Sequence, residues 1–119
     1  MSDFLILSNA NELVRIAAAS LVYVSSEGNY SDIFTRDGRK RTLTMQLGVI
    51  EELMHQQLHS DENEFVRIGK SLIVNLRFVH YLNPSKRQII LSDNQHFKFD
   101  LEASKEALRQ LKDFFEQET

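Results

Sequence analysis

The chain has 119 residues, a formal net charge of −3 and no cysteine. This length fits one domain with its own hydrophobic core, and the lack of cysteine excludes disulfides, thiolate metal ligands and a cysteine nucleophile. The opening MSDFLILSNANEL lacks the basic region and long apolar run of a signal peptide, and no apolar run approaches the roughly 18–20 residues of a membrane span. We therefore expect a cytoplasmic protein with no membrane partner, organised as a single domain over residues 1–119.

Positive charge is concentrated in the middle of the chain. Residues 30–98 hold ten Lys and Arg against eight Asp and Glu, whereas the two flanks together hold four against nine. A locally basic surface is therefore compatible with the negative net charge. The overall charge by itself gives no support for nucleic-acid binding.

The first half of the chain predicts short strands joined by tight turns. Runs of β-branched, aromatic and aliphatic residues indicate strands at residues 4–7, 13–16, 21–25, 30–35 and 40–43. Asp37-Gly38 has the sequence of a tight hairpin turn. Apolar residues at helical spacing then predict a helix over residues 46–58, which Thr44 could cap.

The stretch FVRIGKSLIVN, residues 65–75, has apolar runs on both sides of a polar pair. The runs predict buried strand, and Gly69 inside them suggests a bulge or a tight bend. Lys70 and Ser71 would then lie at an exposed corner. A cation held there by a buried strand on each side is well placed to meet an anion.

The remaining residues predict more hairpins and a final helix. We expect strands at residues 79–82, 88–92 and 96–99, and a helix at residues 104–116 capped by Ser104. About nine short strands and two helices favour a mainly β sandwich of short antiparallel β-sheets, with the two α-helices (about 46–58 and 104–116) covering exposed faces.

The titratable residues form no recognisable catalytic or metal-binding pattern. His55 and His59 lie four apart on the first predicted helix, but no third ligand is apparent and a solvated helix edge is the better interpretation. Gly69-Lys70-Ser71 lacks the earlier glycine of a phosphate-binding loop, because position 64 is Glu64. We expect no enzyme activity, no metal and no cofactor.

The stretch FVRIGKSLIVN also resembles the central motif of the LytTR family, bacterial DNA-binding domains usually found at the C-terminus of response regulators. The matching residues are Phe65, Arg67, Ser71, Val74 and Asn75, whereas Gly69 and Lys70 stand where the family usually has His and Arg. The similarity continues upstream in YVSSEGNYSDIFTRDG (23–38) and downstream in the later strands and the final helix. It is strongest over residues 13–115.

The resemblance implies an elongated arrangement of β-sheets whose loops, and not a recognition helix, enter the DNA major groove. It implies three contact points. The first is near Asn29 and Tyr30, and the second is at Gly69-Lys70, next to Ser71. The third falls just after the last strand, where the family commonly has a Ser-Arg pair and this chain has Asp100 and Glu102.

Basic residues also surround two predicted turns, with Arg36, Arg39, Lys40 and Arg41 at one and Lys86-Arg87 at the other. They have two interpretations: charge that protects an exposed sheet edge from aggregation, or contacts with DNA phosphates. The candidate DNA-binding residues are therefore Asn29, Tyr30, Arg39, Arg41, Lys70, Ser71, Lys86 and Arg87.

These observations favour sequence-specific binding of double-stranded DNA in transcription regulation. A lone domain with few cationic contacts binds weakly, so we expect direct-repeat sites and a homodimer, or a sensor or receiver partner. The alternative is a protein-interaction module of the same fold with weakened or lost DNA binding. The observations that support this alternative are the net charge, Asp100 and Glu102, and the pair Phe114-Phe115. This pair either docks on a partner or packs internally.

Overall fold

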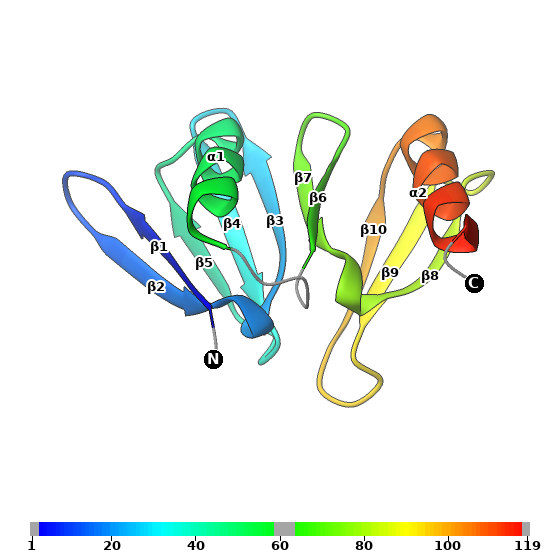
Figure 1. Cartoon of the computed structure of the whole chain (residues 1–119), viewed down its shortest axis with the longest axis horizontal. Coiled ribbons are helices and arrows are strands. Elements are labelled where there is room, and N and C mark those ends of the chain that lie inside the picture. The colour runs from blue at the N-terminus through cyan, green and yellow to red at the C-terminus, as the bar shows by residue number, and fades with distance from the viewer. Residues whose placement is uncertain (1–2, 59–63, 118–119) are drawn as a thin grey trace.

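The computed structural model describes residues 3–58 and 64–117. They form ten strands in three antiparallel sheets with two α-helices, which confirms the mainly β fold (Figure 1). The strands are β1 (Phe4–Ser8), β2 (Leu13–Ala17), β3 (Leu21–Glu27), β4 (Tyr30–Thr35), β5 (Lys40–Leu43), β6 (Phe65–Ile68), β7 (Leu72–Asn75), β8 (Val79–Asn83), β9 (Gln88–Ser92) and β10 (Lys98–Glu102). The helices are α1 (Leu47–Gln57) and α2 (Lys105–Gln117), with 3-10 turns η1 (Ala18–Ser20) and η2 (Leu76–Phe78).

The centre of the molecule is a five-stranded sheet in the order β5-β4-β3-β7-β6. Its strand β7 is buried over all four residues, and successive side chains point to opposite faces. Ile73 joins a core cluster with α1 and the two-stranded sheet β1-β2. Leu72 and Val74 join the other cluster, with α2 and the three-stranded sheet β10-β9-β8. Both faces of the central sheet are therefore covered, as the continuous apolar sequence of β7 predicts.

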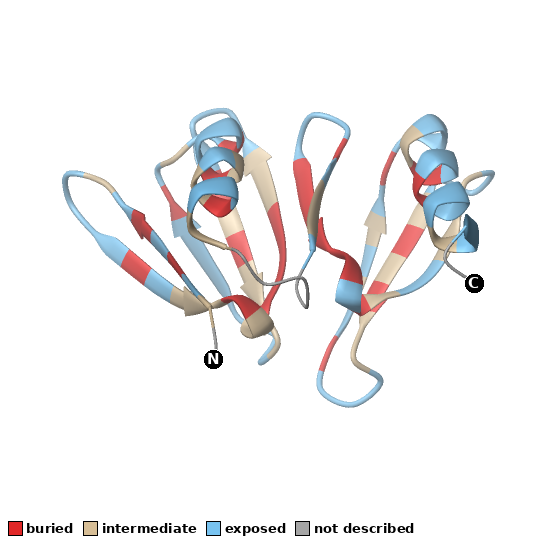
Figure 2. Ribbon diagram, in the orientation of Figure 1, coloured by how far each residue is buried: buried red, intermediate tan, exposed pale blue. Residues whose placement is uncertain are grey.

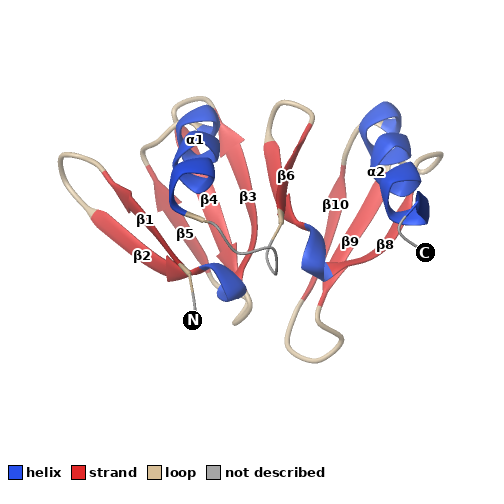
Figure 3. Ribbon diagram, in the orientation of Figure 1, coloured by secondary structure: helices blue, strands red, loops and turns tan. Residues whose placement is uncertain are grey.

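The layers give the molecule an elongated shape of 42 × 34 × 26 Å. Figure 3 shows α1 lying over the five-stranded sheet and α2 over the three-stranded sheet. Buried residues follow the strands and the inner faces of both helices, while the turns are exposed (Figure 2). No helix among the described residues is long and apolar enough to cross a membrane.

A bulge in β3 lets residues of this one strand pack in both core clusters. The pairing of β3 with β4 shifts between Leu21 and Tyr23, and this shift interrupts the strict alternation of side chains. Val22 and Tyr23 both join the α2 cluster, and the Tyr23 ring stacks on Phe34 with 4.2 Å between centroids. Burial, with a smaller contribution from the charge of Asp32, raises the pKa of Tyr23 to about 12. Tyr23 is therefore a neutral core residue.

Of the two helix caps predicted from the sequence, one is present in the structure and one is not. The cap predicted at Ser104 is confirmed, because its Oγ accepts a hydrogen bond from the Ala107 amide at 3.2 Å. The cap predicted at Thr44 is wrong, because α1 begins later, with Gln46 at the N-cap and no side-chain cap bond. The Thr44 carbonyl instead accepts a hydrogen bond from the Asn9 amide group at 3.2 Å.

The last strand also differs from its prediction at residues 96–99. The carboxylate of Asp93 accepts hydrogen bonds from the amides of Gln95, His96 and Phe97, which holds these residues in a turn. Partial burial raises the pKa of Asp93, but these bonds and the His96 side chain outweigh it, so its pKa lies well below the usual value. Strand β10 begins only at Lys98, where pairing with β9 starts.

Candidate nucleic-acid interface

The turns β3–β4 and β6–β7 lie side by side at one end of the central sheet, at the top of Figure 1. Their proximity follows from the topology, because β3 pairs antiparallel with both β4 and β7. Beyond the last paired residues, the Ser26 amide donates a hydrogen bond to the Ser71 carbonyl at 2.9 Å. We refer to this end as the loop end. It brings together two of the predicted contact points.

The β3–β4 turn consists of Gly28 and Asn29, between the paired residues Glu27 and Tyr30. Gly28 has a φ of +63°, a conformation that suits glycine and two-residue hairpins. The Asn29 carbonyl oxygen accepts a hydrogen bond from Gln46 Nε2 at 3.0 Å. This bond ties the turn to the start of α1, and Asn29 Nδ2 donates to no acceptor among the described residues. The Tyr30 side chain is more than half exposed, at 56%.

The β6–β7 turn consists of Gly69, Lys70 and Ser71, between the paired residues Ile68 and Leu72. Gly69 has a φ of +65°, so the glycine that replaces the usual histidine of the motif meets a backbone requirement of this turn. Lys70 and Ser71 are exposed, as predicted for the corner. Lys70 makes no ion pair with any described residue.

Arg67 fixes the β6–β7 turn to the rest of the fold. Its Nη2 donates a hydrogen bond to the Lys70 carbonyl at 2.9 Å, and its Nη1 lies 3.3 Å from Glu51 Oε1 on α1. The guanidinium is thus engaged on both sides, which makes Arg67 a structural ion-pair partner. Because it holds the backbone of Lys70, it limits the positions that the lysine amine can reach.

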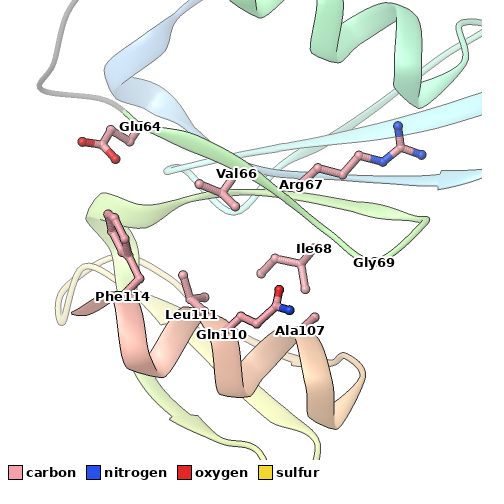
Figure 4. Close-up of a pocket in the computed structure, with 9 residues that line it drawn as sticks. All are labelled: Glu64, Val66, Arg67, Ile68, Gly69, Ala107, Gln110, Leu111 and Phe114. Carbon is pink, nitrogen blue, oxygen red and sulfur yellow. The ribbon is translucent and has the colours of Figure 1, made fainter. Parts of the chain in front are cut away.

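A groove of about 300 Å³ lies behind this turn, between β6 and α2 (Figure 4). Ile68 and Leu111 line it from the two sides, while the Arg67 side chain points away from α2. Phe114 also lines it and remains 39% exposed, whereas Phe115 is partly buried against the α2 core cluster. Of the pair Phe114-Phe115, therefore, only Phe114 presents a large exposed surface.

The β8–β9 turn carries Lys86 and Arg87, and both are exposed. The Arg87 carbonyl accepts a hydrogen bond from the Ala103 amide at 3.2 Å, which places this turn beside the junction between β10 and α2. Arg87 has a φ of +56°, a conformation that costs a non-glycine residue roughly 1–2 kcal/mol. Backbone strain of this kind is concentrated at functional sites in proteins.

The acidic residues at the third predicted contact point belong to a strand and not to a following loop. Asp100 and Glu102 lie within β10, opposite Ile90 and Gln88 of β9. Both oxygens of Asp100 accept hydrogen bonds from Gln88 Nε2, at 3.1 and 3.0 Å. Asp100 is therefore partnered inside the sheet, and Glu102 is the exposed acid nearest to the β8–β9 turn.

The comparison with protein-family models decides the family. Residues 11–116 match the model of the LytTr DNA-binding domain, nearly the whole chain. The chain belongs to this family. It is a family of DNA-binding domains and not of catalytic ones, so membership supports DNA binding in transcription regulation.

A solved LytTr domain has the same fold. It is the LytTr DNA-binding domain of a protein described as a methyl-accepting/DNA response regulator from Bacillus cereus, with a TM-score of 0.61 and 16% sequence identity. The match covers 95% of this chain and 96% of that chain. The search of curated proteins gave no significant match.

Most of the residues that match the LytTr motif hold the fold together. Phe65 and Val74 pack in the two core clusters. The fully buried Asn75 donates from Nδ2 to the Leu21 carbonyl at 2.9 Å and accepts from the Arg77 amide at 3.0 Å. Among the five matching residues, Ser71 alone is exposed with a side chain that makes no hydrogen bond to a described residue, although its carbonyl accepts one from the Ser26 amide. The motif therefore identifies the LytTr fold better than it identifies DNA contacts.

The structure separates Arg39 and Arg41 from the other candidate residues. Arg39 lies at the β4–β5 turn, at the opposite end of β4 from Tyr30, and six strand residues span on the order of 17 Å. Arg41 lies halfway along β5, opposite Ile33. Because β5 is an edge strand, the prediction that its cations protect a sheet edge fits its position.

Two structural features of the candidate turns had no clear signal in the sequence. Gln46 positions Asn29, and Arg87 adopts a positive φ, although neither residue type predicts such a role. Of the His55–His59 pair, His59 lies outside the described residues. Among residues 3–58 and 64–117, no three His, Asp or Glu side chains are grouped to hold a metal ion.

Proposed function

We propose that the chain binds double-stranded DNA in a sequence-specific manner, and that the turns of the loop end enter the major groove. Membership of the LytTr DNA-binding family is the observation that carries this proposal. The loop end and the β8–β9 turn support it, because their exposed cations Lys70, Lys86 and Arg87 take part in no ion pair within the described part of the chain. We propose further that residues 1–119 act as one domain, since both cores share the central sheet.

Lys70 and Asn29 are the proposed base-reading residues. The Lys70 amine can donate to guanine O6 and N7 or to a phosphate, although it lacks the rigid fork of an arginine. The Asn29 amide group can donate to a base acceptor, because Gln46 already occupies its carbonyl oxygen. Ser71 and the Tyr30 hydroxyl lie beside them and can hydrogen-bond to the sugar-phosphate backbone.

Lys86 and Arg87 provide the third contact in this proposal. They lie beside the β10–α2 junction, which is where the family resemblance implies a cation and where the chain has Glu102 instead. Phosphate contacts from these two residues fix the position of the duplex and carry little sequence information. Glu102 opposes them, because a carboxylate near the phosphate backbone is repelled.

With few cationic contacts, one copy binds weakly, and two copies on direct-repeat DNA gain affinity through effective concentration. A homodimer, or a receiver or sensor partner that brings two copies together, would serve this purpose.

Selection from a randomised duplex library, followed by titration in increasing salt, tests the proposal. We expect a short enriched site whose affinity falls steeply with salt through counterion release. Lys70→Ala should weaken binding to that site about tenfold. Lys98→Ala is the matched control, because Lys98 is an exposed lysine at the other end of β10.

Enrichment of no sequence, together with weak binding that Lys70→Ala leaves unchanged, would contradict the proposal. The fold would then serve as a protein-interaction module, the alternative that the acidic residues of β10 suggest. Equal losses in Lys70→Ala and Lys98→Ala would show nonspecific charge attraction instead of base reading.

A further inference from the structure

A polar groove of about 460 Å³ lies between β2 and the β4–β5 hairpin, away from the loop end. One side is formed by the consecutive β2 residues Leu13–Ile16. The other side is formed mainly by residues of one face of the hairpin, including Ile33, Arg39 and Arg41. The proposed DNA contacts of the loop end use neither side of this groove.

The β2 side of the groove is a strand edge. Strand β2 pairs with β1 alone among the described strands, so the backbone groups along its second edge have no ladder partner there. Consecutive residues of a strand point to opposite faces, so a groove that touches four in succession runs along their main chain. Such an edge is a template for another strand.

The hairpin side supplies positive charge over an apolar floor. Ile33 is 1% exposed and lies opposite Arg41 in the β4–β5 register, so both belong to one face of the hairpin. Arg39, Lys40 and Arg41 line the groove from the hairpin and Arg15 lines it from β2, with Asp37 as the single acid. Asp37 lies 3.6 Å from Arg39, and this exposed pair contributes at most about 1 kcal/mol. Lys40 and Arg41 make no ion pair with a described residue.

The two sides of the groove are fixed relative to each other. At one end, Asn9 Nδ2 donates to the Thr44 carbonyl at 3.2 Å, which joins the β1–β2 turn to the end of β5. At the other end, the Arg36 amide donates to the Ser20 carbonyl at 2.9 Å, which joins the hairpin to η1. A groove that is formed before binding costs a ligand less conformational entropy.

We propose that this groove binds an extended acidic segment of a partner protein, which adds as a strand to the free edge of β2. Alternate carboxylates of that strand meet Arg39 and Arg41, and its backbone pairs with Leu13–Ile16. A peptide fits better than a nucleic acid, because a phosphate backbone has no donors to match the carbonyls of a strand edge. The groove residues Arg39 and Lys40 also lie at the far end of β4 from Asn29, away from the proposed DNA contacts.

Fluorescence anisotropy with a labelled peptide of alternating Glu and Val tests this inference. We expect saturable binding to the full chain, reduced at least tenfold in the double variant Arg39→Ala/Arg41→Ala. A peptide in which Lys replaces Glu should not bind. A peptide in which Pro replaces Val should bind at least tenfold more weakly, because proline removes the backbone donors. Lys98→Ala is the matched control and should bind like the parent chain.

Three results would overturn the inference. One is no saturable binding of the Glu-Val peptide up to about 1 mM, the limit of weak recognition. Another is equal binding of the proline peptide, which would show charge attraction without strand addition. The third is loss of duplex DNA binding in Arg39→Ala/Arg41→Ala as large as in Lys70→Ala, which would make the groove part of a DNA surface. If the circular dichroism spectrum of Arg39→Ala/Arg41→Ala differs from that of the parent chain, this variant is not used. The variant Arg39→Gln/Arg41→Gln then takes its place in the test.

Discussion

The two ends of the central sheet both carry exposed positive charge, but they hold it differently. At the loop end, Lys70 lies on the β6–β7 turn, and Lys86 and Arg87 lie on the β8–β9 turn of the three-stranded sheet. None of the three pairs with a carboxylate among the described residues. At the opposite end, Arg36 lies 3.7 Å from Asp93, and Arg39 lies 3.6 Å from Asp37. The loop end therefore offers its cations to a ligand, while part of the charge at the opposite end joins hairpins to one another.

This difference shows that the number of basic residues does not identify the interface. The sequence has its densest cationic group at residues 36–41, yet two of the three arginines there have an acidic partner in the fold. Lys70 is a single cation between apolar runs, but the Arg67 bond to its carbonyl and the positive φ of Gly69 set its position. Position and pairing separate the two ends where charge alone does not.

Charge reversal at each end should give the largest difference in duplex affinity between the two ends. Lys70→Glu should weaken duplex binding about hundredfold, because it removes a contact and adds a repulsion. Its melting temperature should stay close to that of the parent chain, since Lys70 is exposed and makes no ion pair in the described structure. Anisotropy with the enriched duplex and thermal unfolding measure the two effects.

Arg39→Glu is the counterpart of this change at the opposite end. It should alter duplex affinity less than about threefold, because charges beyond about 8 Å are largely screened at physiological salt. Comparable losses in Lys70→Glu and Arg39→Glu would show that the duplex contacts both ends.

Replacing Glu102, the acid beside the β8–β9 turn, should sharpen the contrast. Glu102→Arg places a cation next to the β8–β9 turn, where the family resemblance implies one, and should raise duplex affinity about tenfold. Glu102→Gln, which removes only the negative charge, should give a smaller gain. A titration of both variants at one salt concentration measures this, and unchanged affinity in both would place Glu102 outside the interface.

Replacing Arg87 should change stability and DNA binding in opposite directions. Arg87→Gly relieves the positive φ and should raise the free energy of unfolding by about 1 kcal/mol. It also removes a cation and should lower duplex affinity about fivefold. Denaturant unfolding and anisotropy measure the pair of effects. A loss of stability would instead show that the guanidinium supports the fold.

The smallest effect should be at the opposite end, and it should disappear in acid. Because the pKa of folded Asp93 is lowered, its contribution to stability is complete above the unfolded value of about 3.9 and is lost as the pH falls through the folded value. Asp93→Asn should be less stable than the parent chain at pH 7, and this difference should shrink below about pH 4. Thermal melts over that range check it, and a difference that is constant with pH would contradict the role of the charge.

Much of the fold could be predicted from local sequence, because apolar runs and turn residues specify short strands. The limits came from polar side chains that bond to backbone groups. Asp93 holds the amides of the next few residues in a turn and so delays β10, whereas Asn9 bonds to the distant carbonyl of Thr44 while α1 starts at Leu47. The pattern of apolar residues that marks the elements indicates neither contact.

The candidate site was harder to predict than the fold. The two turns that carry Asn29 and Lys70 could be named from the sequence, but their shared end depends on β3 pairing with both β4 and β7. The same topology places Arg39 at the opposite end of the central sheet. Its spacing from Tyr30 along the chain does not reveal this separation.

An NMR titration of the ¹⁵N-labelled chain with its enriched duplex tests the central claim most directly. We expect the largest amide shift changes at residues 28–30, 69–71 and 86–88, with those at residues 36–41 nearly unchanged. This result would place the duplex at the loop end. Large changes confined to residues 36–41 would contradict the account and would assign DNA binding to the opposite end.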